Sequence, residues 1–415
     1  MSQFTQLQDR RYDLDWLRVF AILLVLLFHV GMFFVHWPWH IKNPETSRGF
    51  GYVMAFLHQW RMPLLLFISG AGTMFASSRR SKGEFALERT RRLFVPLIFS
   101  MFVVVPPQIY FERIGSYSSY LDFYRTVFDF VPYPMGGSFS WHHMWFVLYL
   151  FLYSLVAIPL IAFLRSERSR GFIAGLERFF SRTWGFVSYA LLIILSQAIL
   201  RPYFPEETHT LINDWAYATQ LFLFFLAGLV VSVSPKLWAI LLERRRFHVA
   251  AALASLALME FLYATPWDSL QPYLRVNLET IWDVNELIVA WTWVIAIIGY
   301  GQKYLNKKSV IVKQANEGIY PFYILHQTVI IAIAYPMIIW EAGMMVKFVV
   351  LTVLSFAATV SIYLLLIRPF DVMRFLFGMK PKGAKLKDAH ARAVRPHIAA
   401  EESIGSERVP AGLDA

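Results

Sequence analysis

Long apolar runs separated by short polar segments dominate this chain of 415 residues. A helix rises about 1.5 Å per residue and must cross about 30 Å of hydrocarbon, so each membrane span needs about 20 residues. Ten segments approach that length, and we predict helices near 16–36, 52–77, 93–112, 143–164, 184–203, 216–234, 248–264, 282–301, 318–340 and 346–367. The pattern predicts an all-α, polytopic integral membrane protein with about ten transmembrane helices.

The basic residues of the connecting loops predict the orientation, because Lys and Arg in short loops are retained in the cytoplasm. The richer set of loops holds Arg79, Arg80, Lys82, Arg89, Arg91, Arg92, Arg165, Arg168, Arg170, Arg178, Arg182, Lys236, Arg244, Arg245, Arg246, Lys303, Lys307, Lys308 and Lys313. The opposite loops hold only Lys42, Arg48, Arg113, Arg125, Arg201 and Arg275. We therefore expect both termini in the cytoplasm and a multi-pass protein of the cell (inner) membrane.

Composition supports a lipid-facing exterior, since 57% of the residues are hydrophobic and only 16% are charged. The net charge of +11 does not indicate nucleic-acid binding, because the basic residues lie in short runs between apolar segments. The absence of cysteine excludes disulfides, thiolate nucleophiles and cysteine-ligated metals. We predict a transmembrane domain over 1–370 and, because the sequence turns polar without apolar periodicity, a disordered cytoplasmic tail over 381–415.

Three ionisable residues lie on one stripe of the first predicted helix: Asp15, Arg18 and His29. At about 100° per residue, the eleven-residue step from Arg18 to His29 returns to within about 20° of the same direction. Ionisable groups inside the membrane are costly and usually face a cavity or each other. Arg18 could instead be an anchor whose charged end reaches the membrane surface, and His29 a hydrogen-bonded packing residue.

The second predicted helix carries His58, Arg61 and Ser69, with His58 and Ser69 again eleven residues apart on one face. Arg61 lies among apolar residues and needs a carboxylate, a carbonyl or an anionic ligand as its partner. Further along, the segment YPFYILHQ (320–327) places His326 among polar residues at helical spacing. The chain has no GxxxxGK[ST], GxSxG or HExxH motif, and its histidines show no zinc pattern, so we predict no metal site.

The segment YDLDWLRVFAILLVLLFHVGMFF, in which ten residues separate Arg18 from His29, resembles the opening of membrane acyltransferase family 3. The resemblance continues through RMPLLLFISG (61–70), ERTRRLFVP (88–96), HMWFVLYL (143–150) and YPFYILHQ (320–327). Each motif is short, but their order and sidedness agree over nearly the whole membrane region. The extension HWPWHIKNP (36–44) further resembles a glucan succinyltransferase branch of that family.

The resemblance implies transfer of an acyl group from cytoplasmic acyl-CoA to a hydroxyl of an extracytoplasmic glycan or related acceptor. Succinyl-CoA or acetyl-CoA would be a co-substrate, no cofactor would be bound, and membrane lipid would surround the protein. His29 would act as general base or nucleophile, Arg18 would position the donor or stabilise negative charge, and Asp15 would hold Arg18. The implied donor-binding residues are Arg61, Ser69, Arg89 and Arg92. The implied acceptor-side residues are His40, His58, Trp145 and His326.

Two other functions remain open from the sequence. A transporter or flippase of an acylated or sugar-linked molecule could also line a cavity with an intramembrane His and Arg. A membrane sensor or scaffold without catalytic activity would tolerate replacement of His29 apart from effects on folding. Covalent acyl labelling of an acceptor, as opposed to translocation without modification, distinguishes the enzyme from the carrier.

Overall fold

The computed structural model describes residues 10–78 and 80–382, and within these residues it is all-helical, with one isolated bridge between Pro132 and Phe139. The first half contains α1 (Tyr12–Met32), α2 (Arg48–Ser77), α3 (Lys82–Arg89), α4 (Val95–Val103), α5 (Pro106–Glu112), α6 (Tyr120–Arg125), α7 (Trp145–Leu164) and α8 (Arg170–Phe180). The second half contains α9 (Tyr189–Leu200), α10 (Trp215–Val231), α11 (Pro235–Glu243), α12 (Arg245–Ala264), α13 (Pro272–Leu305), α14 (Val310–Met337), α15 (Met344–Ile362) and α16 (Asp371–Leu376). The predicted tail lies outside the described residues from 383 onward.

Seven helical segments of the described residues are long and apolar enough to cross a membrane, or eight if the bent α10–α11 pair forms one span. The other two predicted spans correspond to α9, which has 12 residues, and to α2. The helix α2 has 30 residues, but His58, Gln59 and Arg61 make its middle polar. All ten predicted segments therefore coincide with helices, while length and composition alone qualify seven or eight of them as spans.

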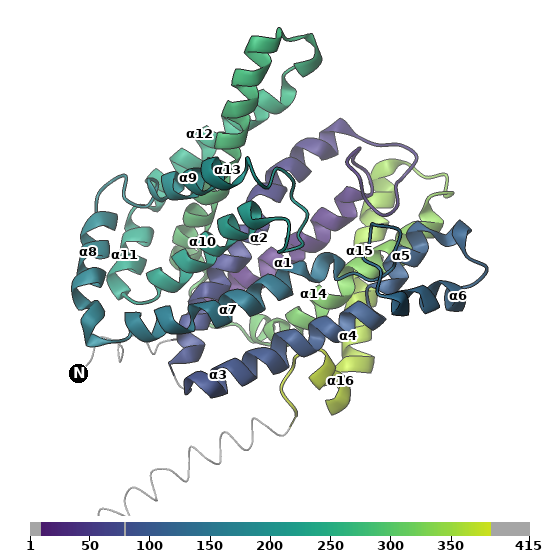
Figure 1. Cartoon of the computed structure of the whole chain (residues 1–415), viewed down its shortest axis with the longest axis horizontal. Helices are drawn as coiled ribbons and strands as arrows, with labels where there is room; N and C mark the ends of the chain where they lie inside the picture. Colours follow the sequence, from purple (N-terminus) through teal and green to yellow (C-terminus); the bar gives the residue numbers. More distant parts are fainter. Residues whose placement is uncertain (1–9, 79, 383–415) are drawn as a thin grey trace, which may run out of the picture.

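Helix α1 occupies the centre of the bundle, where it packs against α2, α13, α14 and α15. Figure 1 shows this arrangement and the α12–α13 hairpin, which extends beyond the other helices. Most residues of α1 and half of those of α14 are buried, whereas α15 exposes much of its apolar surface, such as Val349 and Val353. Polar side chains on α1, α2 and α14 consequently meet inside the protein.

The structure corrects two details of the predicted elements. The predicted segment 216–234 ends too late, because α10 ends at Val231 and the chain then bends by 109° into α11. Ser234 caps α11 by accepting from the Lys236 N–H, and Pro235 occupies its first turn, both of which favour a new helix start. The first helix spans Tyr12–Met32 and not 16–36, since the chain turns at Phe33.

Helices α2 and α10 approach each other through two reciprocal glycines. A Cβ built on Gly70 would lie 1.9 Å from the carbonyl oxygen of Phe225, and one on Gly228 would lie 1.9 Å from that of Phe67. Small residues at such crossings let helix backbones approach closely in membranes. This contact holds α2, and with it Arg61, at a fixed distance from α10.

We expect Gly228→Ala to separate α2 from α10, because the neighbouring atoms are backbone and cannot rotate away. Overpacking costs about 1–3 kcal/mol in well-packed cores, and we expect the upper end of this range or more. The thermal midpoint of the purified protein measures the loss. Gly171→Ala on α8 is the matched control, since nothing lies within 4 Å of the added Cβ. Equal midpoints for the two variants would contradict the close contact.

Candidate active site

A pair of histidines from α1 and α14 forms the centre of the candidate site. His29 Nδ1 lies 2.9 Å from His326 Nε2, and His326 Nδ1 is bonded to the backbone carbonyl of Tyr323. A carbonyl only accepts, so His326 Nδ1 carries a proton and donates it. With both rings neutral, His326 Nε2 accepts from His29 Nδ1–H, and His29 Nε2 keeps a free lone pair. The fold therefore selects the His29 tautomer that can act as a base or a nucleophile.

Arg61 lies beside this pair without a carboxylate partner in the part of the chain that the structure describes. Its guanidinium carbon lies 3.4 Å from the centre of the Phe28 ring, and Nη1 lies 3.2 Å from His58 Nδ1. The side chain is 6% exposed, and its Nε is buried without a hydrogen-bond partner. A buried cation compensated only by an aromatic face and a neutral imidazole attracts a negatively charged group. The cationic side chain is held near His29 by Phe28, whose ring also contacts the His29 ring.

A second group of polar side chains extends from the histidine pair toward the end of α1. Gln327 donates to the side-chain oxygen of Gln108 at 3.0 Å and approaches His40 Nε2 at 3.1 Å. Gln108 approaches His143 Nδ1 at 3.3 Å, and the His143 ring packs edge-on against His326. These contacts join α5, α14 and the loop after α1 into one hydrogen-bonded network.

The outer end of this network is a carboxylate–imidazole pair. Glu112 Oε2 lies 2.8 Å from His40 Nδ1, and the Tyr133 hydroxyl donates to the same carboxylate at 2.9 and 3.1 Å. The His142 ring stacks on His40 with ring centres 4.8 Å apart. Burial, with the neighbouring Glu112 charge, raises the pKa of Tyr133 to about 12, so its hydroxyl stays a donor at neutral pH. These contacts fix the orientation of His40, which is half-buried at the outer end of the network.

Basic residues meet at the opposite end of α1. Arg18 Nη2 lies 3.6 Å from the position of a Cβ on Gly72, and Arg89 Nη2 lies 3.4 Å from the hydroxyl of the next residue, Thr73. The Nε of Arg89 is buried without a hydrogen-bond partner. Arg18 and His29 are eleven positions apart, a distance of about 16 Å along the helix. Arg18 thus lies far from the histidine pair, at the end of α1 where Arg89 also lies.

The remaining predicted residues are placed less centrally. Asp15 approaches Arg18 at 3.9 Å but pairs more closely with Arg10 at 2.7 Å. Arg92 lies in the π-helical turn Thr90–Phe94, where it donates to the Gly378 carbonyl at 3.3 Å and is half-exposed. Ser69 is half-buried on α2 and eight residues beyond Arg61. These positions put Arg92 near the Arg89 end and leave Ser69 without an assigned contact.

Trp145 belongs to a neighbouring aromatic cluster. Its ring centre lies 4.5 Å from that of His209 and 5.9 Å from that of Tyr217. Asp214 shapes the loop before α10 by accepting from the backbone N–H groups of His209 and Tyr217. Burial, followed by the charge of Arg61, lowers the pKa of His209 to about 4. Tyr217 lies in the first turn of α10, which packs against α2, so this cluster adjoins α2.

The lowered pKa of His209 predicts a pH-dependent stability. Between pH 6.5 and pH 4 the unfolded chain protonates this imidazole while the folded chain does not, so stability falls as the pH falls. A pKa shift of this size corresponds to a decrease in the free energy of unfolding on the order of 3 kcal/mol. We expect His209→Gln to lose less stability than the parent protein over this interval, measured as thermal midpoints at both pH values. An equal fall of the thermal midpoint in both proteins would contradict the lowered pKa of His209.

Sequence reasoning missed three members of the network: Gln108, Glu112 and His143. Gln108 follows two prolines within an otherwise apolar segment, and that isolated amide was an available signal. Among residues 10–78 and 80–382, no group of three His, Asp or Glu side chains is placed to hold a metal ion.

Comparisons with known proteins place the chain in context. A family model described as an acyltransferase domain matches residues 11–366. Glucans biosynthesis protein C from Escherichia coli strains SMS-3-5 / SECEC, K12 / DH10B and O81 (ED1a) is 21% identical over 331 residues, covering 77% of this chain and 81% of each relative. No solved structure matches this chain.

Proposed function

The chain belongs to this acyltransferase family and is an acyltransferase, and we propose that it transfers an acyl group across the membrane from acyl-CoA to an extracytoplasmic hydroxyl. The observation that carries the proposal is the His29–His326 pair, whose hydrogen bonds leave His29 Nε2 unprotonated. Both this pair and the basic end of α1 lie within the matched residues. The donor would bind at the basic end, and the acceptor would enter from the His40 end.

In the proposed reaction, His29 Nε2 removes the proton of the acceptor hydroxyl while the hydroxyl oxygen attacks the thioester carbonyl carbon. A C–O bond forms, the C–S bond breaks, and the proton passes from His29 to the leaving sulfur to give the free thiol. In a two-step route the same lone pair would attack the thioester carbonyl carbon first, and the C–S bond would break to release the thiolate. The acceptor oxygen would then form the C–O bond as the C–N bond of the acyl-imidazole breaks, and the hydroxyl proton would pass to the thiolate. His326 and the Tyr323 carbonyl hold the imidazole in the required tautomer during either route.

Arg61 would stabilise the negative charge that develops on the thioester oxygen. Positive groups fixed before the reaction, in a site without bulk water, contribute strongly to such stabilisation. Arg61 fits this role because no carboxylate among the described residues neutralises it. His58, which contacts the guanidinium, would hold it in place.

The donor phosphates would bind to Arg18, Arg89 and Arg92 through charge-assisted hydrogen bonds. The separation of about 16 Å along α1 between Arg18 and His29 suits a long donor whose phosphates lie far from its thioester. Ser69 on α2 lies between the two ends and would line the path of the donor. Asp15 would hold Arg18 at the entrance.

The acceptor would bind where His40 and its partners end the polar network. His40, paired with Glu112, offers an imidazole and nearby amides for hydroxyl groups of a glycan, and the rings of Trp145 and His209 offer an aromatic surface. A glycan acceptor agrees with the names of the relatives, which are glucans biosynthesis proteins. The acyl group would be succinyl or acetyl. The loop charges suggest cytoplasmic termini in the inner membrane, with acyl-CoA in the cytoplasm.

Proteoliposomes with a known protein orientation test the direction of transfer. Radiolabelled acyl-CoA is supplied on the side of the basic loops, and an oligosaccharide acceptor on the other side. We expect covalent label on the acceptor, and no label when the two substrates exchange sides. Movement of an unmodified molecule across the membrane would instead indicate a carrier.

A further inference from the structure

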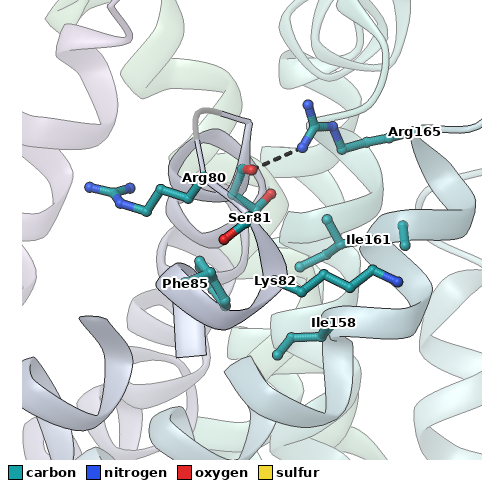
Figure 2. A pocket seen from close by; sticks show the side chains of 9 residues that line it. Arg80, Ser81, Lys82, Phe85, Ile158, Ile161 and Arg165 are labelled. Atoms are coloured by element: carbon teal, nitrogen blue, oxygen red, sulfur yellow. Dashed lines mark hydrogen bonds between the residues drawn. The ribbon is translucent and has the colours of Figure 1, made fainter. Parts of the chain in front are cut away.

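A pocket separate from the histidine site lies where α2 ends, α3 begins and α7 ends. Its volume is about 220 Å³. Its polar lining consists of Ser77, Arg80, Ser81, Lys82 and Arg165, and its apolar lining of Phe85, Ile158, Ile161 and Ala162. Figure 2 shows Arg80, Lys82 and Arg165 around the pocket, with Ile158 and Ile161 presented by α7. A cationic rim therefore adjoins an apolar wall.

Carboxylates do not fully neutralise the cations of this pocket. Arg80 pairs with Glu88 at 3.1 Å, but the acceptors of Arg165 among the described residues are the neutral carbonyls of Ser77 and Ser78, at 2.9 and 3.3 Å. Lys82 is exposed and has no ion-pair partner in the described part of the chain. Positive charge remains in excess even when the nearby carboxylate of Glu84 is counted.

The first turn of α3 is not itself the binding group. Ser81 caps the helix by accepting from the Glu84 N–H at 3.2 Å, and the Glu84 carboxylate accepts from the Ser81 N–H at 2.9 Å. These two bonds occupy two of the backbone donors at this helix start, the Ser81 and Glu84 N–H groups. The cationic groups of the pocket that can hold an anion are the ammonium of Lys82 and the guanidinium of Arg165.

The apolar wall continues onto the outer surface of the bundle. On α7, Val156 and Phe163 are 63% and 42% exposed on either side of the pocket residues. Such surface on a membrane span faces acyl chains, while the pocket cations lie at the helix ends, where lipid headgroups lie. A ligand that fills both halves has an anionic head and an apolar chain.

We propose that this pocket binds the phosphate group of an anionic phospholipid, with one acyl chain along Ile158, Ile161 and Ala162. Basic pockets between helix ends bind anionic headgroups by the same chemistry in other membrane proteins. The phosphate contacts Lys82 and Arg165. The Phe85 ring, one wall of the pocket, also lies under the Arg89 guanidinium at 4.8 Å, so the lipid site adjoins the basic end of α1.

Native mass spectrometry of the purified full-length protein tests this site with phosphatidylglycerol as the probe. Each basic residue near an anionic lipid contributes about fivefold in affinity, so Lys82→Gln with Arg165→Gln should weaken binding about 25-fold. The matched control is Arg168→Gln with Arg178→Gln, which removes two exposed charges nearby and should leave the strongest adduct unchanged. Equal losses in both double variants would overturn a specific site.

Two further comparisons separate the lipid from other phosphate sources and from misfolding. Inorganic phosphate and coenzyme A should not displace phosphatidylglycerol at equal concentration, and displacement by either would overturn the lipid assignment. Arg165→Lys keeps the charge and should bind the lipid within about twofold of the parent protein. Lys82→Gln alone removes a side chain that has no ion-pair partner among residues 10–78 and 80–382, and it should weaken binding about fivefold. An unchanged affinity for Lys82→Gln would contradict the proposal.

Discussion

The variant His29→Ala is expected to lower the turnover number for acyl transfer by about a hundredfold to ten-thousandfold. Removal of the imidazole leaves no base beside the reacting hydroxyl, because the Nε2 lone pair of His326 lies behind the vacated ring, 2.9 Å from where His29 Nδ1 stood. The measurement is transfer of radiolabelled acyl groups by purified protein in proteoliposomes, normalised to folded protein.

The matched control is His248→Ala. His248 is another buried intramembrane histidine, 1% exposed on α12, and it has no place in the proposed reaction. We expect this variant to retain most of its activity per folded molecule although its stability falls. A similar loss of turnover in both variants would mean that His29 acts through packing alone.

The variant Arg61→Met is expected to lower the turnover number by about a hundredfold to a thousandfold, the range found when one oxyanion-stabilising group is removed. Methionine fills much of the space over Phe28 but supplies no charge. Arg61→Lys should recover part of the rate, because its ammonium supplies the charge without the planar guanidinium. Steady-state kinetics with varied acyl-CoA separates turnover from donor binding.

Arg48→Met provides the comparison for Arg61→Met on the same helix. Arg48 starts α2 and donates to the Tyr263 carbonyl at 3.3 Å. We expect nearly parental kinetics from this variant. If Arg61→Met raised the KM for acyl-CoA and left the turnover number unchanged, Arg61 would bind the donor without stabilising the reacting group.

The sequence predicted the helices well because apolar length and helical periodicity are local properties. The stripe of Arg18 and His29 follows from an eleven-residue step alone, and the structure confirms that both lie on α1. The bend after Val231 was not predicted, although Ser234 and Pro235 signal a helix start. Hydropathy averaged over a window as long as a membrane span does not detect such a break, because the residues on both sides of it are apolar.

The contacts around the site could be predicted only in part. The expected partner of Arg61 was a carboxylate, a carbonyl or a ligand, but the guanidinium lies on Phe28 and beside His58. The bond between His29 and His326 joins residues 297 positions apart, a pairing that periodicity in either helix does not encode. The packing of α1 against α14 determines this pairing of His29 with His326, and that packing depends on the whole helical bundle.

Mass spectrometry of periplasmic and surface glycans tests the central claim most directly. Cells lacking the protein are compared with cells that express the parent chain or His29→Ala at equal protein level. We predict that one defined acyl mass disappears from the glycans without the protein, returns with the parent chain and does not return with His29→Ala. Full restoration of that mass by His29→Ala would contradict the account.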